Sequence, residues 1–319
     1  MKSAALVLLI LCLAACGQAV PAADTAADRI VEDFPEPADP IARRAALPDY
    51  LDCIREAGGV LIAAHRAGPA PGYPENAIET MAYGLSRGVH VFEIDVVESR
   101  DGVQFLLHDR TLGRTTTGNG SVADTDWVDI ATLRLVDNAG TVTSFAPPRF
   151  TDALLWAKDN DAILEVDRKD TTSFRNIISN VRAADAEDHV ILISYTNEQA
   201  AEIAALAPDL MMTATARGGR DIAALENAGV DSDNLIAWTG TREPDAPAWA
   251  RNARQGVESA FGTLGRPGER LDDAYGADGD LNEYQSLVDD GLVLLATDAP
   301  YAVADYLTAD DRANRACGR

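Results

Sequence analysis

The alternation of short apolar segments with segments of helical spacing is the feature that most restricts how this chain can fold. Eight apolar runs of five to seven residues, bounded by turn residues or charges, have the length and composition of buried strands. They cover residues 60–65, 91–96, 162–168, 190–194, 210–215, 234–238, 256–261 and 292–297. Helical spacing of apolar residues follows most of them, over residues 76–87, 172–184, 196–206, 222–228 and 281–289. Such alternation indicates βαβ units and a parallel sheet.

Two parallel architectures satisfy this alternation, a closed eight-stranded barrel and an open doubly wound sheet. An open sheet that binds a nucleotide has a glycine-rich turn between strand and helix, and the sequence contains no G-x-G-x-x-G or G-x-x-x-x-G-K-[ST] segment. A chain of 319 residues also has room for a barrel of about 250 residues with appendages. We therefore predict an α/β fold, a (β/α)8 TIM barrel.

One stretch interrupts the alternation after the second predicted strand. Residues 101–148 contain another strand-like run, 103–108, and then Gly118, Gly120 and a Pro-Pro pair. Glycine and proline at this density are typical of turns and irregular structure. We predict a hairpin and a small insertion over one rim of the barrel.

The first residues predict export and a lipid anchor. Lys2 precedes an apolar run over 4–15, which is too short to span a hydrocarbon core of about 30 Å and has the form of a signal-peptide core. The run ends in Leu-Ala-Ala before Cys16, and this sequence resembles a bacterial lipobox, whose cysteine takes the lipid. We predict a signal peptide over 1–15 and lipidation of Cys16. Gly17, in place of an inner-membrane retention aspartate, favours the periplasmic face of the outer membrane. An ordinary secretory signal with an unmodified cysteine is the alternative.

The segment that follows and the overall charge restrict the partners. Residues 16–47 are rich in Ala, Pro and Asp without apolar periodicity, which predicts a flexible lipid-anchored tether to a barrel domain over 48–319. With 51 acidic and 27 basic residues, the net charge of −24 disfavours nucleic acid and anionic lipid as electrostatically captured partners. Such a field attracts divalent cations, whereas an anionic substrate would need local positive charge. No protein partner is predicted.

Cys53 and Cys317 are the two cysteines that a processed domain would keep as thiols. A closed barrel brings its first and last elements together, and an exported protein meets an oxidising environment. We predict a disulfide between them. Two free thiols are the alternative, because sequence spacing alone does not establish proximity.

Polar residues at the ends of the apolar runs are the candidates for chemistry, because barrel enzymes place their sites at the C-terminal ends of the strands. They are His65 and Arg66 at the end of the first run, Glu93 and Asp95 on the second, His108 in the insertion, and Glu165, Asp167 and Lys169 on and just after the next strand. Residues two apart on a strand share a face, so these carboxylates project together. Buried like charges need compensation, and a hard cation such as Ca²⁺ or Mg²⁺ provides it through oxygen ligands.

These residues resemble the motifs of the glycerophosphodiester phosphodiesterase family, a phosphatidylinositol-phosphodiesterase-like TIM barrel. The family pattern runs from His-Arg through Pro-Glu-Asn and Glu-x-Asp to His-Asp and Arg-x-Thr-x-Gly-x-Gly. The matching segments here are His65–Arg66, residues 74–76, 93–95 and 108–109, and residues 114–120. The Thr-Asp-Ala-Pro segment at 297–300 is also similar, so the resemblance covers about 60–307.

The strand over 162–168 departs from the family pattern, which usually has Glu-x-Lys there. Here Glu165 is followed by Asp167 and then Lys169. Aligning Asp167 and Lys169 with the family pair makes Asp167 the metal ligand and leaves Glu165 as an extra inward carboxylate. Glu165 is the alternative ligand. A second departure is Ala67, where the family commonly has glycine.

The resemblance implies metal-dependent hydrolysis of glycerophosphodiesters to glycerol 3-phosphate and an alcohol. It implies acid–base catalysis by His65 and His108, phosphate binding by Arg66 and Lys169, and a Ca²⁺ or Mg²⁺ ion on Glu93, Asp95 and Asp167. A phospholipase D-like hydrolase of lysophospholipid or sphingolipid head groups is the alternative, and an acyl groove beside the site would favour it. A lipoprotein that binds a phosphodiester without turnover is the second alternative.

Overall fold

The protein, for which we use a computed structural model, is described over residues 46–307 and at Cys317. All described elements belong to the second of two compact units, Arg44–Arg319. The predicted signal peptide, Cys16 and nearly all of the predicted tether over 16–47 lie outside the described residues. Within the described part, no helix has the length and apolar character needed to cross a membrane.

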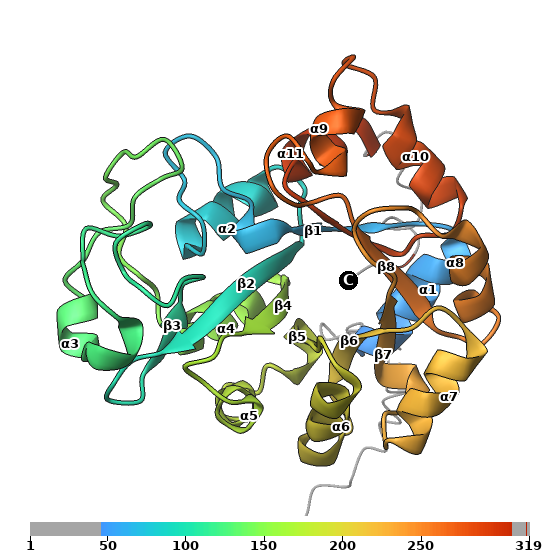
Figure 1. The fold of residues 1–319 in the computed structure, drawn as a ribbon, viewed down its shortest axis with the longest axis horizontal. Helices are drawn as coiled ribbons and strands as arrows, with labels where there is room; N and C mark the ends of the chain where they lie inside the picture. Colours follow the sequence, from blue (N-terminus) through green and yellow to red (C-terminus); the bar gives the residue numbers. More distant parts are fainter. Residues whose placement is uncertain (1–45, 308–316, 318–319) are drawn as a thin grey trace, which may run out of the picture. The chain divides into compact units, whose positions relative to one another are not determined.

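Eight parallel strands close into a barrel, which confirms the predicted (β/α)8 fold (Figure 1). They are β1 (Leu61–Ala64), β2 (Val91–Glu98), β4 (Ile163–Arg168), β5 (Val190–Ile193), β6 (Met211–Thr215), β7 (Leu235–Trp238), β8 (Glu258–Gly262) and β9 (Leu294–Thr297). The strands are neighbours in chain order, and β1 pairs with both β2 and β9 to close the ring. Each lies within two residues of a predicted strand, because continuous apolar runs are typical of strands that are covered on both faces.

Helices surround the barrel and bury its outer face. They are α2 (Ile78–Ser86), α4 (Phe150–Asn160), α5 (Phe174–Ala183), α6 (Asn197–Leu206), α7 (Gly219–Asn227), α8 (Ala246–Ala253), the short α9 (Leu271–Tyr275), α10 (Asn282–Asp289) and α11 (Pro300–Leu307). The side-chain hydroxyls of Ser173 and Thr196 accept hydrogen bonds at the starts of α5 and α6, as helix caps do. Helices α4 and α8 were not predicted from the sequence, although their buried faces pack on the barrel in the same way.

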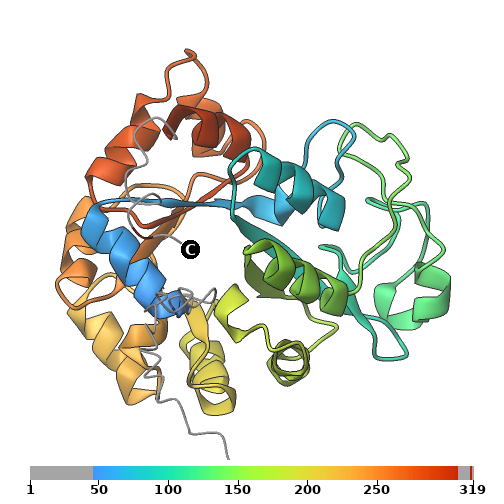
Figure 2. The same cartoon turned by 180° about the vertical axis from the view of Figure 1, so that it is seen from behind.

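Helix α1 (Leu47–Ala57) closes the N-terminal end of the barrel, as the view from behind shows (Figure 2). Its apolar residues recur at helical spacing. Leu47, Leu51 and Ile54 are fully buried against side chains from the first residues of the barrel strands. This helix was not predicted, and it begins one residue before the predicted start of the domain.

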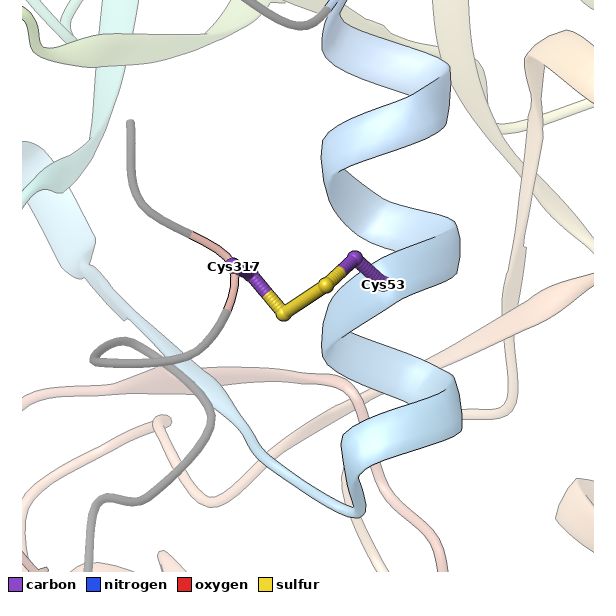
Figure 3. The surroundings of a disulfide bond; sticks show 2 residues. All are labelled: Cys53 and Cys317. Carbon is purple, nitrogen blue, oxygen red and sulfur yellow. A yellow bond between two sulfur atoms is a disulfide. The ribbon is translucent and has the colours of Figure 1, made fainter.

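Cys53 of α1 is joined to Cys317 by a disulfide, with Cα atoms 5.7 Å apart (Figure 3). The bond attaches residue 317 to the helix on the barrel floor, at a sequence separation of 264 residues. The pairing proposed from the sequence is therefore present in the structure.

The insertion after β2 forms a small lobe beside the barrel (Figure 1). Strand β3 (Gln104–Leu106) pairs antiparallel with β2, and the short helix α3 (Trp127–Ile130) follows. The lobe has its own apolar cluster, which includes Phe105, Leu112 and Ile130. Because the hairpin returns toward the C-terminal ends of the strands, it brings residues 108–114 to the same end as the polar ends of β1, β2 and β4.

Candidate active site

Three buried carboxylates meet at the C-terminal end of β2 and β4. Glu93, Asp95 and Asp167 each offer an oxygen, and these oxygens all lie within 4.8 Å of one another. The parallel pairing of β2 with β4 sets Asp95 opposite Asp167, so the convergence follows from strand register. A cluster of this kind, built from oxygen donors alone, fits a hard divalent cation.

The charges in this cluster are only partly compensated by protein groups. Burial, together with Asp95 and Asp167, raises the pKa of Glu93 well above its usual value. Burial also opposes ionisation of Asp95, but the nearby Lys169 and His108 outweigh it and lower the pKa of Asp95. The Lys169 ammonium lies 2.6 Å from Asp95 Oδ1 and also contacts Asp167. One ammonium therefore serves two carboxylates, and among the described residues no Lys or Arg side chain forms an ion pair with the third, Glu93.

Glu165 lies two residues before Asp167 on β4, opposite Glu93 in the β2–β4 register. It is buried, and its Oε2 atom has no hydrogen-bond partner among the described residues. Burial, and then Asp167, raises the pKa of Glu165 to about 7. The sequence-based ligand set of Glu93, Asp95 and Asp167 thus lies together, and Glu165 is an additional buried carboxylate level with Glu93.

His65 is held by a carboxylate from the last strand. It lies in the short 3-10 turn His65–Ala67 after β1, and its Nδ1 lies 2.7 Å from Asp298 Oδ1. Burial opposes ionisation of Asp298, but hydrogen bonds from His65, the Gly265 amide and Arg270 lower its pKa to about 2. An ionised carboxylate only accepts hydrogen bonds, so Nδ1–H of His65 donates. The free Nε2 lies 4.0 Å from Glu93 Oε2, beside the carboxylate cluster.

Asp298 is itself held by groups buried beneath it. Its backbone amide donates to Asp272 Oδ2 at 2.7 Å, and the Thr297 hydroxyl donates to Asp272 Oδ1 at 2.7 Å. The Tyr284 hydroxyl donates to the same Oδ1 atom at 2.7 Å. This buried network fixes the end of β9 and hence the position of the His65 partner.

His108 has a matching arrangement in the insertion. Its Nδ1 lies 2.8 Å from Asp109 Oδ1, and Arg114 donates to both oxygens of Asp109. These Arg114 hydrogen bonds are the main reason that the pKa of Asp109 falls to about 2. Both candidate histidines therefore present a free Nε2, which is the arrangement that general acid–base catalysis requires.

Glu75 connects the insertion to the turn after β1. Its buried carboxylate accepts two hydrogen bonds from Arg114, at 2.8 and 2.9 Å, and two longer ones from Arg66 Nη1, at 3.3 and 3.5 Å. The Arg66 amide donates to Glu93 Oε2 at 2.7 Å, while Arg66 Nε is buried without a partner among the described residues. Arg66 and Ala67 both have positive φ, at 52° and 69°, a conformation that explains why glycine suits the position of Ala67.

A cavity of about 560 Å³ adjoins the cluster on the side of His108. Its lining includes His108, Asp109, Lys169, Asp170, Tyr195 and Gln199, and no Val, Leu, Ile, Met or Phe is among the described residues that line it. The Tyr195 hydroxyl donates to Asp167 Oδ2 at 2.8 Å. The cavity therefore leads directly from a candidate metal ligand to solvent.

The histidines and carboxylates were predicted from the sequence to lie together, but several residues that hold them had no predicted role. Asn76 donates to Asp95 Oδ2 at 2.7 Å and accepts from the Asp95 amide at 2.9 Å. Asp298, Glu75 and Arg114 stood in quoted motifs without a role, and those motifs were the available signal. Tyr195 had no motif, because its position depends on the loop after β5.

A TIM barrel whose C-terminal end carries a buried carboxylate cluster and two carboxylate-held histidines has the groups that acid–base and metal-assisted hydrolysis would use. The model of the glycerophosphoryl diester phosphodiesterase family matches residues 65–216, a span that contains both histidines and all the cluster residues. Residues 65–216 of this chain therefore match the glycerophosphodiester phosphodiesterase family over just under half of its length.

Individual relatives agree with this family. A glycerophosphodiester phosphodiesterase from Caldanaerobacter subterraneus is 27% identical over 158 residues, which cover 47% of this chain and 64% of the relative. A glycerophosphoryl diester phosphodiesterase structure from Parabacteroides distasonis has a TM-score of 0.71 at 25% identity and covers 84% of this chain and 93% of its own. An Oleispira antarctica phosphodiesterase solved with sn-glycerol-3-phosphate has a TM-score of 0.56 at 18% identity, covering 80% and 99%. The chain spans less than two thirds of the length of the first curated relatives that it matches.

Proposed function

We propose that the protein is a metal-dependent glycerophosphodiester phosphodiesterase, which releases glycerol 3-phosphate and an alcohol. The observation that carries the proposal is the convergence of Glu93, Asp95 and Asp167 between two histidines that each have an aspartate on Nδ1. The family match and the glycerol 3-phosphate complex of the Oleispira relative support the same substrate class.

The cofactor in this proposal is Ca²⁺ or Mg²⁺, held by Glu93, Asp95 and Asp167. These ions take carboxylate oxygens, and the described residues of the cluster include no thiolate or imidazole ligand. When bound, the ion would supply positive charge to the phosphoryl oxygens as negative charge develops on them. It would also compensate Glu93, for which burial and like charges make ionisation unfavourable.

The two histidines would move the protons. A hydroxyl of the glycerol moiety attacks phosphorus and gives its proton to Nε2 of one histidine, and the other histidine protonates the departing alkoxide. The new P–O bond closes a cyclic phosphate as the bond to the alcohol breaks. Water then opens the cyclic phosphate by the reverse proton transfers, which restores both histidines and yields glycerol 3-phosphate. Such catalysis contributes about 3 to 5 kcal/mol, a minor part of a barrier reduction near 20 kcal/mol, so charge stabilisation must supply much of the rest.

Arg66 and Lys169 are proposed to bind the phosphoryl oxygens. Arg66 Nε is a buried donor without a partner among the described residues, and an anionic oxygen would satisfy it. Lys169 borders the cavity while its ammonium contacts Asp95 and Asp167. These two cations would offset the repulsion between an anionic substrate and a chain of net charge −24.

The alternative substrates, lysophospholipids and sphingolipids, would need an apolar surface for an acyl chain. The described residues that line the cavity beside the cluster are polar or charged apart from the ring of Tyr195. This lining favours glycerophosphodiesters with water-soluble alcohols. A binding protein without turnover would not need two histidines with free Nε2 atoms.

We also propose that Cys16 carries a lipid and that residues 16–47 tether the enzyme to the periplasmic face of the outer membrane. The motif before Cys16 and the composition of the tether support this. Water-soluble diesters would then reach the barrel without passing through the bilayer.

Phosphorus NMR of product mixtures tests the function. The full chain, loaded separately with Ca²⁺ and Mg²⁺, is incubated with a panel of glycerophosphodiesters and lysophospholipids. We expect glycerol 3-phosphate from the diesters, with activity lost in His65→Ala and His108→Ala. His90→Ala is the matched control, because His90 is an exposed histidine outside the site, and it should remain active. Turnover that persists in both site variants would contradict the mechanism.

A further inference from the structure

Tyr195 stands apart from the other site residues because most of it is exposed. It follows β5, and its backbone amide donates to Gln199 Oε1 at 2.8 Å, which fixes the loop to the start of α6. Its hydroxyl reaches Asp167 Oδ2 at 2.8 Å, yet the residue is 64% exposed. The residue is thus held at its backbone amide and at its hydroxyl, and the ring between them is open to solvent. Such a ring presents a preformed surface to a ligand.

The ring lines the cavity of about 560 Å³ that also contains His108 and Gln199. This volume is within the range of small-molecule sites. The Asp170 carboxylate on the same lining is paired with the exposed Arg110 guanidinium, and Arg168 donates to the Thr172 carbonyl at 3.0 Å. Because the Asp170 and Arg168 charges already have partners, these residues offer hydrogen-bonding groups beside the aromatic surface of Tyr195 rather than an unpaired charge.

The two histidines differ in the space beside them. His65 lies between Asp298 at 2.7 Å and Glu93 at 4.0 Å and is not among the residues that line the cavity. His108 does line it. In an in-line displacement at phosphorus, the attacking and departing oxygens lie on opposite sides of the phosphorus atom. The glycerol moiety is constant in this substrate class and the alcohol varies, so the open side suits the alcohol.

We infer that this cavity is the subsite for the alcohol moiety and that the Tyr195 ring determines specificity for compact hydrophilic alcohols, above all polyols. A polyol has hydroxyls for the polar lining and C–H faces that pack on an aromatic ring. An acyl chain has no aliphatic lining to contact among the described residues of the cavity. The inference rests on the proposed function and names the part of the substrate that the cavity holds.

Two variants and two substrates test it. Tyr195→Phe loses the hydroxyl that contacts Asp167 but keeps the ring, so it is the reference for Tyr195→Ala. Glycerophosphoinositol carries a polyol, whereas glycerophosphomethanol has the same glycerol phosphate and almost nothing to contact the ring. Relative to Tyr195→Phe, we expect Tyr195→Ala to lower kcat/KM for the inositol diester roughly three- to tenfold, the range typical of an aromatic contact. For the methanol diester the change should stay below about twofold.

The outcomes separate the two proposals. Equal losses for both diesters, or no loss for the inositol diester, would overturn the subsite while the enzyme itself stands. A wild-type protein that hydrolyses neither diester would overturn the proposed function. Thermal unfolding of each variant checks that it is folded, and the 64% exposure of Tyr195 makes loss of the fold an unexpected result.

Discussion

His65 depends on Asp298, a residue that does not face the cavity. Asp298→Asn would remove the charge that stabilises a protonated His65 and could present an amide N–H to Nδ1, which favours the wrong tautomer. We expect kcat to fall on the order of 100-fold with a smaller change in KM, because Asp298 acts through His65. Steady-state kinetics check this. Asp305→Asn, at a surface aspartate paired with Arg87, is the control and should change neither constant.

Strand β4 carries the sequence feature that departs from the family pattern. Substitutions of Asp167 and Glu165 decide which of these two carboxylates binds the metal. Asp167→Asn should weaken cation binding and remove most activity, with partial recovery at excess metal, because a hard cation loses an anionic oxygen. Glu165→Gln should have the milder effect on affinity. Lys169→Met should keep metal binding and lose turnover. Titration calorimetry with Ca²⁺ and Mg²⁺ separates these effects, and abolished binding in Glu165→Gln with unchanged binding in Asp167→Asn would make Glu165 the ligand.

At the scale of elements, α1 and the disulfide together close the floor of the barrel. Cys53→Ser would release residue 317 from α1. The disulfide links residues 264 positions apart, so its loss would raise the conformational entropy of the unfolded chain. We expect a loss of about 2 to 4 kcal/mol in the free energy of unfolding and a lower Tm, with catalysis unchanged at moderate temperature, since the site lies at the opposite end of the barrel. Urea unfolding without reductant measures it. Identical curves for wild type and variant would mean that the bond does not constrain the unfolded chain.

Glu258 makes the contact between α1 and β8 dependent on pH. Burial raises its pKa from 4.5 to about 7, although the adjacent Arg55 guanidinium opposes this. A raised carboxyl pKa means that the folded state holds the proton more tightly. The protonated Glu258 carboxyl therefore contributes to the free energy of unfolding in full below about pH 4.5, and this contribution is lost as pH rises through about 7.

Glu258→Gln should remove this dependence. Between pH 5 and pH 8 the wild type should lose up to about 3 kcal/mol relative to the variant. Denaturant unfolding at both pH values gives the comparison, and Glu202→Gln on α6 serves as a surface control. Parallel stability profiles for wild type and Glu258→Gln would show that burial does not shift this carboxyl.

At the scale of the whole molecule, the anchor and the barrel should be separable. Cys16→Ser should abolish lipid attachment and leave the activity of the barrel intact, because the tether contains none of the site residues. Fractionation of cells that express the variant, with an activity assay on each fraction, checks both parts. If the variant still partitions wholly with membranes, lipidation at Cys16 is not what holds the protein there.

The sequence by itself determined the barrel and most of the groups that we propose for its chemistry. Runs such as 190–193 are apolar on both faces because both faces are covered, and the polar residues of other runs gather toward the C-terminal end of the barrel because barrel sites form there. The histidines and carboxylates stood out for that reason. The family resemblance then linked them to one reaction.

Only the tertiary structure decided how these groups are held. The contacts of His65 with Asp298, of Glu75 with Arg114, and of Tyr195 with Asp167 join residues 233, 39 and 28 positions apart. No local pattern encodes such pairs, because strand register and loop geometry bring them together. The packing of α1 on the barrel floor depended likewise on an apolar helix face whose partner, the barrel interior, does not exist until the sheet closes.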